Sequence, residues 1–320
     1  MRIYRQLAEV PADFGPAALS IGNFDGVHFG HRRILRRVRA VAAERGLKAS
    51  VLTFDPHPTR VVAPARAPRL LTTPERRCEL MREEGIEQAL ILPFDGELAR
   101  LSPDEFARRL LAERLGVRAV LVGDNFRFGY GQAGNVDVLR ELGERYGFST
   151  EIVAAVEYRG RTVSSSTLRR LVAAGDVGIA ARLLERPYAL EGEVVPGRGV
   201  GSRQTVPTLN LATAAEVVPA AGVYITRTRD LDDERGWESI TNVGYRPTFG
   251  DSPELTIETF LLAPLEGATP RRIRVEFLRR VRGERKFDSP EALKAQILRD
   301  AARAVAWFRR VRRWVRTPPA

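Results

Sequence analysis

The chain has 320 residues, of which 44% are hydrophobic, a length and composition that predict two domains with a packed core in each. Its net charge of +11 would favour a polyanionic partner. The single cysteine, Cys78, excludes an internal disulfide and a cysteine-based zinc cluster. Three histidines leave too few ligands for a transition-metal site built by the protein alone.

The positive charge is spread along the chain. Three of the 51 basic residues are lysines, which leaves 48 arginines in almost every predicted helix, so a general bias towards arginine explains the charge. The densest cluster combines Arg303 and residues 309–316 with Trp307 and Trp314 interleaved, and we interpret it as a solvated helix face. We find no apolar run long enough to span a bilayer, which predicts a cytoplasmic protein without a membrane partner.

Up to about residue 186, short apolar runs alternate with helical patterns, which is typical of a parallel sheet covered by helices. Each predicted helix ends at a glycine that can adopt the left-handed conformation of a C-terminal cap. In such open α/β sheets, ligands bind at the carboxyl ends of the strands. The predicted strands are 17–22, 49–54, 88–92, 117–122 and 150–153, and the glycine stops are Gly46, Gly85, Gly116 and Gly147.

The first predicted strand runs into the segment 22–31, Gly-Asn-Phe-Asp-Gly-Val-His-Phe-Gly-His, which opens a helix. Free backbone N–H groups and the helix dipole favour an anion there, and the glycines let phosphate oxygens approach the backbone. His28 and His31 can donate to a phosphate whose charge grows in the transition state. A single histidine is more often structural, but two histidines flanking Gly30 favour nucleotide chemistry.

Further polar motifs follow the other strands. Asp55-Pro56-His57-Pro58 follows the second strand and the segment 123–129, Gly-Asp-Asn-Phe-Arg-Phe-Gly, the fourth. We expect a structural role for His57, whose ring can bond neighbouring backbone in a turn fixed by two prolines. The segment 164–167, Ser-Ser-Ser-Thr, is a good helix start, and its hydroxyls together with Arg170 would also suit a triphosphate.

After Pro187 the pattern changes to β-type runs separated by Gly, Pro and Asp turns, which predicts a small antiparallel barrel. The runs are 190–195, 223–228, 239–243, 256–262 and 272–277. A last helix begins at Ser289-Pro290-Glu291 and runs towards Arg316. We therefore expect domains at 1–186 and 187–320.

Taken together, these motifs resemble the bacterial bifunctional riboflavin kinase/FAD synthetases over nearly the whole chain. The first domain is similar to their Rossmann-like FMN adenylyltransferase module, through segments 22–31, 53–58, 123–129 and 165–170. The second resembles their riboflavin kinase module, through 192–210, 242–244, 258–262 and 282–287 in the expected order. The resemblance implies that riboflavin, FMN and ATP are the substrates and that Mg²⁺ is the cofactor.

For the adenylyltransferase, the resemblance implies that His28 and His31 stabilise the charge that develops on the phosphates. Ser166, Thr167 and Arg170 would grip those phosphates. The remaining residues expected to bind ATP or FMN are Gly22, Phe24, Gly30, Asn125 and Arg161.

For the kinase, the resemblance implies that Glu258 is the base that accepts the proton of the attacking hydroxyl. Thr208 and Asn210 would hold Mg²⁺ and nucleotide, because hydroxyl and amide oxygens suit that cation. Gly197, Gly201 and Pro207 complete the expected nucleotide loop. Without the resemblance, Glu258 would read as an outward-facing carboxylate on a strand.

The sequence departs from the family pattern in both domains. Leu168 stands where many relatives carry Arg, and Leu209 replaces the alanine of the kinase signature. Thr205 occupies a usual glycine position, and the segment 263–267 differs from the usual one. One alternative is therefore an FMN adenylyltransferase whose C-terminal module only binds flavin.

Two other classes are weaker. An aminoacyl-tRNA synthetase would share the His-x-Gly-His turn but also needs a lysine-rich signature, and this chain has three lysines. A basic RNA- or DNA-binding protein would leave His28, His31 and Glu258 without a purpose, so we expect no specific nucleic-acid partner. Homo-oligomerisation is left open by the sequence.

Overall fold

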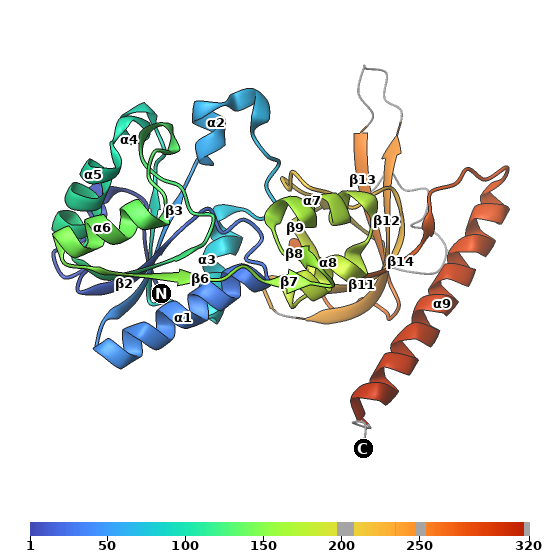
Figure 1. Cartoon of the computed structure of the whole chain (residues 1–320). Helices are drawn as coiled ribbons and strands as arrows, with labels where there is room; N and C mark the ends of the chain where they lie inside the picture. The colour runs from blue at the N-terminus through green and yellow to red at the C-terminus, as the bar shows by residue number, and fades with distance from the viewer. Residues whose placement is uncertain (197–207, 234, 247–253, 317–320) are drawn as a thin grey trace. The chain divides into compact units, whose positions relative to one another are not determined.

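A computed structural model describes the backbone of residues 1–196, 208–233, 235–246 and 254–316 (Figure 1). Side chains are described in the same ranges except at 161, 246, 254, 290 and 313–316. The chain divides into two compact units, Met1–Thr167 and Leu168–Ala320. Along the chain, helices α7 (Ser165–Ala174) and α8 (Val177–Leu184) come after the last strand of the first sheet and before the first strand of the barrel. The domain boundary after residue 186 stays a prediction.

The first unit is built on a six-stranded, all-parallel sheet in the order β1-β4-β3-β2-β5-β6. All five predicted strands are confirmed, and a short edge strand was missed. The strands are β1 (Arg2–Tyr4), β2 (Ala17–Ile21), β3 (Lys48–Phe54), β4 (Gln88–Leu92), β5 (Val117–Gly123) and β6 (Ser149–Val153). A small hairpin, β7 (Glu157–Tyr158) with β8 (Arg161–Thr162), precedes α7.

Helices connect these strands, and the predicted glycine stops are confirmed. Gly46, Gly85, Gly116 and Gly147 have φ of 63°, 85°, 57° and 82°, the left-handed region that glycine occupies without strain. The helices are α1 (Phe29–Arg45), α2 (Pro58–Val62), α3 (Pro74–Glu83), α4 (Gly96–Arg100), α5 (Pro103–Glu105) and α6 (Val136–Tyr146). Short 3₁₀ turns (Leu7–Glu9, Pro64–Arg66, Tyr130–Gln132) and a π-helix (Phe106–Arg114) complete the unit.

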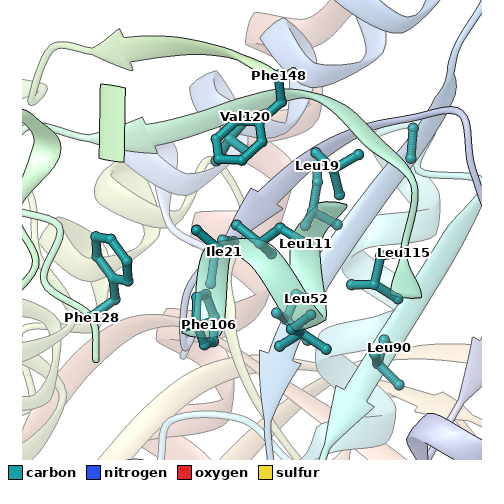
Figure 2. Close-up of a cluster of buried hydrophobic side chains, with 14 of the residues drawn as sticks. Leu19, Ile21, Leu52, Leu90, Phe106, Leu111, Leu115, Val120, Phe128 and Phe148 are labelled. Carbon is teal, nitrogen blue, oxygen red and sulfur yellow. The ribbon is translucent and has the colours of Figure 1, made fainter. Parts of the chain in front are cut away.

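Two apolar clusters cover the two faces of this sheet. Leu19 and Leu52 belong to one cluster, while their chain neighbours Ala18 and Val51 belong to the other. This alternation follows from the two-residue period of a strand. Figure 2 shows the first cluster, in which Leu111 and other residues of the π-helix pack against the strands. Burial on both sides explains why β2 and β4 read as continuous apolar runs.

The second unit contains a closed antiparallel barrel in the order β10-β13-β12-β11-β14-β9, which confirms the predicted barrel. Its strands are β9 (Tyr188–Val195), β10 (Thr208–Ala212), β11 (Gly222–Asp230), β12 (Gly236–Arg246), β13 (Glu254–Leu261) and β14 (Arg272–Gly283). Strand β10 was not among the predicted runs. Inside the barrel, the buried hydroxyl of Thr226 forms hydrogen bonds of 2.8 Å with the hydroxyls of Ser239 and of Thr241, which satisfies these polar atoms.

The predicted terminal helix is confirmed as α9 (Pro290–Arg316). Ser289 caps it, because its Oγ accepts from the N–H of Ala292 at 3.2 Å. Ala304 and Phe308, one turn apart, are buried against Val223, Ile225 and Ile240 of the barrel. Within the described residues, no helix combines the length and apolar character needed to cross a bilayer.

Candidate functional site

The first candidate site lies where the strand order of the sheet reverses. Strand β2 pairs with β3 on one side and with β5 on the other. The chain runs from β2 outward through β3 and β4, and then continues on the opposite side with β5 and β6. Ligands bind at such a switch point, outside the carboxyl ends of the strands. His28 follows β2 and Asn125 follows β5, so two sequence motifs reach this position.

The loop that carries His28 has an unusual backbone. Phe24, Gly26 and Val27 have φ of 48°, 81° and 37°, and the left-handed region is costly for a β-branched residue such as Val27. The Asp25 carboxylate holds the loop, since it accepts from the N–H of Leu71 at 2.9 Å and that of Thr72 at 3.1 Å. Asp25 is 1% exposed, so these bonds are shielded from water.

A buried arginine supports the same loop from α3. Nη1 of Arg77 donates to the carbonyl of Asn23 at 2.8 Å and to the Thr53 hydroxyl at 3.2 Å, and the residue is 3% exposed. Burial lowers the pKa of Arg77, while the carboxylates of Asp25 and Asp55 act in the opposite direction. Sequence reasoning missed both Asp25 and Arg77 as positioning residues. Arg77 is buried in α3 beside Cys78, Leu80 and Met81, but no pattern in the sequence marked it as a positioning residue.

The two histidines lie against each other. His28 is the N-cap of α1, and its Nδ1 accepts from the N–H of His31 at 3.3 Å. The rings stack with centroids 3.6 Å apart and planes 14° apart, while Phe24 contacts His31 edge-on at 5.2 Å. A neutral His28 ring therefore carries its proton on Nε2, which can donate to a phosphate oxygen.

Two glycines of the motif make room for these rings. A Cβ on Gly30 would lie 3.2 Å from Cε1 and 3.3 Å from Nδ1 of His28, and a Cβ on Gly22 would lie 3.3 Å from the Phe24 ring. Both distances are tighter than ordinary packing. Gly22 and Gly30 therefore leave the space that the two aromatic rings occupy. This role is additional to the close approach of a phosphate that we expected from these glycines.

The serine cluster lies beside the histidine loop. Oγ of Ser165 donates to the carbonyl of Asp25 at 2.9 Å, and Ser164 caps α7 by accepting from the N–H of Thr167 at 3.2 Å. Ser165 belongs to the predicted cluster 164–167 and here holds the loop, whereas Ser166 is exposed and Thr167 is half-buried at the start of α7. The hydroxyls of this cluster and the two imidazoles therefore lie around one loop.

The remaining predicted residues of this site are located only by the elements that carry them. Arg170 is exposed and lies one helical turn after Ser166 in α7, and Asn125 is exposed after β5. Arg161 starts β8, and its side chain is outside the described residues. His57 caps α2, because its Nδ1 accepts from the N–H of Thr59 at 3.2 Å, which confirms the structural role expected for it.

The second candidate site is a polar row across three strands of the barrel. Glu258 of β13 pairs with Asn210 of β10 on one side and with Asn242 of β12 on the other. These side chains are half-buried, while Leu209 and Thr259, their chain neighbours, point into the barrel. Thr208 shares the face of Asn210, because residues two apart on a strand point the same way. The predicted Gly197, Gly201 and Pro207 lie outside the described residues.

Glu258 and Asn242 line a cavity of about 290 Å³ between the barrel and α9. Its apolar walls are Val223, Ile240, Phe260, Phe287, Leu293 and Ile297, and its polar groups are Asn242, Glu258, Arg282, Glu284, Arg285 and Asp300. Asp300 accepts from Nε of Arg282 at 2.8 Å, and the guanidinium of Arg285 lies 4.5 Å from the Phe287 ring centroid. An apolar slot with a few placed polar groups suits a flat aromatic ligand. Sequence reasoning missed the contribution of α9 to this cavity.

Comparison with known proteins matches each half of the chain to a family model. The family model described as FAD synthetase matches residues 10–167, and the one described as riboflavin kinase matches residues 184–308. The chain belongs to the family of bifunctional riboflavin kinase/FMN adenylyltransferases. Proteins of that name from Pseudomonas fluorescens and Escherichia coli K12 are 37% and 33% identical to it over 308 residues. These matches cover 96% of this chain and 98% and 97% of the relatives.

A third relative of the same name, from Bacillus subtilis, is 31% identical and covers 93% of this chain and 94% of its own. Among solved structures, a Streptococcus pneumoniae protein described as a macrolide-efflux protein matches with a TM-score of 0.82 and 25% identity. That match covers 93% of this chain and 96% of the other. The family resemblance read from the sequence motifs is thereby confirmed across both modules.

Proposed function

We propose that this chain phosphorylates riboflavin to FMN with one ATP and transfers the adenylyl group of a second ATP to FMN, which forms FAD and pyrophosphate. Both activities belong to its family. The observation that carries the proposal is that each unit contains groups whose chemistry suits one of the two reactions. The first unit has the stacked His28 and His31, and the second has Glu258 at an apolar cavity.

In the kinase reaction, the isoalloxazine ring of riboflavin would occupy the cavity between the barrel and α9, with its ribityl chain directed to Glu258. The terminal hydroxyl attacks the γ-phosphorus of ATP, and the Glu258 carboxylate accepts the hydroxyl proton as the new P–O bond forms and ADP leaves. Asn242 and Asn210, which flank Glu258, can orient the hydroxyl and the nucleotide by hydrogen bonds.

The donor atoms of Thr208 and Asn210 fit a magnesium ion. One hydroxyl and one amide oxygen on the same face of β10 are hard ligands, and Mg²⁺ commonly takes few protein ligands together with water and substrate phosphates. Within the described residues, no group of three or more His, Cys, Asp and Glu side chains could hold a metal. When bound, Mg²⁺ would neutralise charge on the β- and γ-phosphates.

In the adenylyl transfer, a phosphate oxygen of FMN attacks the α-phosphorus of ATP, and pyrophosphate leaves. The nucleophile is already anionic at neutral pH, so the site needs no base. It must align two polyanions and stabilise the charge on the α-phosphate and on the leaving group. Nε2 of His28, His31, and the hydroxyls of Ser166 and Thr167 are the donors that we assign to this task, with Arg170 on the phosphates.

The alternative of an adenylyltransferase with an inactive C-terminal module is weakened by where the departures fall. Leu209 is 3% exposed and points into the barrel, so it changes the core and leaves the face of Thr208 and Asn210 unchanged. The differing segment 263–267 does not line the Glu258 cavity, and Arg235 donates to the carbonyl of Glu266 within it. Thr205 lies outside the described residues.

The direct test is a flavin time course. The full-length protein is incubated with ATP and Mg²⁺ and either riboflavin or FMN, and the flavins are separated by chromatography. We expect FMN to appear before FAD from riboflavin, and FAD from FMN without a lag. FAD from FMN alone would establish the adenylyltransferase alternative, and no product from either substrate would overturn the proposal.

A further inference from the structure

A second cavity of the barrel unit is lined by none of the residues assigned above to either reaction. It has a volume of about 360 Å³ and lies between α9 and strands β11 and β14. Its lining residues are Ile225, Arg279, Arg280, Val281, Arg303, Ala306, Trp307 and Arg310. Four of these eight are arginines, one is tryptophan and none is acidic. This composition sets it apart from the Glu258 cavity, which has three carboxylates in its wall.

The strand side of this arginine cavity is shaped by two irregularities in β14. Consecutive residues of a regular strand point to opposite faces, yet Arg279, Arg280 and Val281 all line the cavity. The register between β11 and β14 shifts once on each side of the pair Arg279 and Arg280. Such bulges change the direction of side chains and are frequent next to functional sites.

The helix side presents one face of α9. Arg303, Trp307 and Arg310 are spaced by four and three residues, which places them in one row along the helix. Ala304 and Phe308 anchor the helix on the barrel, and Trp307 packs partly against the same apolar cluster. The cluster that we interpreted from the sequence as a solvated helix face therefore contributes Arg303, Trp307 and Arg310 to a cavity.

One guanidinium of this cavity is held in place, and the positive charge of the four arginines is only weakly neutralised. Arg280 donates to the carbonyls of Ala174 and Ala221 at 3.0 and 2.9 Å, which fixes its guanidinium through uncharged acceptors. Among the described residues, these four arginines form one ion pair, in which Arg303 lies 3.9 Å from the carboxylate of Asp300. Asp300 already accepts from Arg282 at 2.8 Å.

We propose that the arginine cavity binds a nucleoside di- or triphosphate at a site separate from both reaction sites. Guanidinium groups grip phosphate oxygens in pairs, and both indole and guanidinium planes stack on an aromatic base. The volume is within the range of small-ligand sites. The same chemistry of phosphates and bases also occurs in single-stranded nucleic acid, so the test separates these two sources.

The test counts ADP molecules bound per full-length chain by equilibrium dialysis. The double variant Arg279→Ala/Arg310→Ala removes two charges from the cavity, and Arg309→Ala is the matched control, because Arg309 is exposed on the same helix but does not line the cavity. We expect the double variant to bind one ADP fewer than the wild type, while Arg309→Ala keeps the full number. Equal numbers in all three proteins would overturn the proposal.

Two further readouts make the result specific. ADP should quench the tryptophan fluorescence of the wild type. Part of that quenching should be absent in Arg279→Ala/Arg310→Ala, and the same part should be absent in Trp307→Phe. Both rates of flavin conversion should stay within about twofold of wild type, because surface changes away from a site rarely alter it. The proposal would also be overturned if a single-stranded 12-mer binds in a way that depends on Arg279 and Arg310 while the double variant binds as much ADP as the wild type. That result would assign the cavity to polynucleotides.

Discussion

The histidine site and the Glu258 site are constructed in opposite ways. His28 and His31 come from one ten-residue segment whose backbone holds both rings, whereas Asn210, Glu258 and Asn242 come from three strands that meet through barrel register. Both rings of the first site lie on one loop, which distant segments hold in place through Asp25 and Arg77. The second site requires the correct pairing of strands that are distant in sequence, and therefore the fold of the whole barrel. Variants can therefore separate the two sites, because each variant should change one reaction, and the stability of either the loop or the barrel.

The largest effect is expected from the double variant His28→Ala/His31→Ala. Removing one donor that stabilises developing charge costs about 10²–10³ in turnover, so loss of two should lower FAD formation by about 10⁴-fold or more. FMN formation from riboflavin should remain within about twofold, because the Glu258 site has its own groups. Steady-state rates with FMN and with riboflavin as substrates check both statements. Equal loss of both rates in a folded protein would contradict the separation.

The next effect is expected from Glu258→Gln. The amide keeps the shape of the side chain but cannot accept the hydroxyl proton, so FMN formation should fall by about 10³-fold, within the usual range for a general base. FAD formation from FMN should not change. Unaltered FMN formation in this variant would show that Glu258 is not the base. Thr259→Val, a change at the buried neighbour of Glu258, is the matched control for effects on the barrel core.

Gly30→Ala is a finer test of the histidine site, because it adds one methyl group against the His28 ring. The ring must shift by a few tenths of an ångström, and misplacement on this scale can cost up to about 10²-fold. We expect a loss of FAD formation below that of the double histidine variant and unchanged FMN formation. Gly147→Ala is the control for the protein fold, since it strains a helix cap away from the site. Full FAD formation in Gly30→Ala would show that the contact does not position His28.

The smallest effect on turnover is expected from Leu209→Ala, which restores the residue of the kinase signature. The buried side chain packs inside the barrel, so its truncation should destabilise the protein by about 2–5 kcal/mol. The rate of FMN formation at a temperature where the protein is folded should change by less than about threefold. Thermal unfolding and the kinase assay together check this expectation. A large change of rate with unchanged stability would place Leu209 in the site.

The difference between the sites also explains what the sequence could predict. The segment 22–31 contains both histidines and their glycines, so the first site was visible as a motif, and five of the six strands of its sheet followed from apolar runs. Asp25 and Arg77 were missed because their role depends on the tertiary contacts with Leu71 and Asn23. Periodicity alone cannot show such contacts.

In the barrel, the sequence predicted five of the six strands but neither β10 nor the arrangement of the site. Asn242 became a neighbour of Glu258 only through register, and α9 supplies Leu293, Ile297 and Asp300 to the cavity although its pattern reads as an ordinary amphipathic helix. The two bulges in β14 have no sequence signal that we recognise. Nothing in the sequence linked Arg279 and Arg280 to the arginine cluster of α9, which was interpreted as a solvated helix face.

The most direct test of two separate sites is a mixing experiment. His28→Ala/His31→Ala and Glu258→Gln are combined in one vessel with riboflavin, ATP and Mg²⁺, and the flavins are followed by chromatography. We predict that neither variant forms FAD from riboflavin at an appreciable rate alone, and that the mixture does so after free FMN has accumulated. A mixture that produces no FAD, although each variant is folded and retains its expected single activity, would contradict the account.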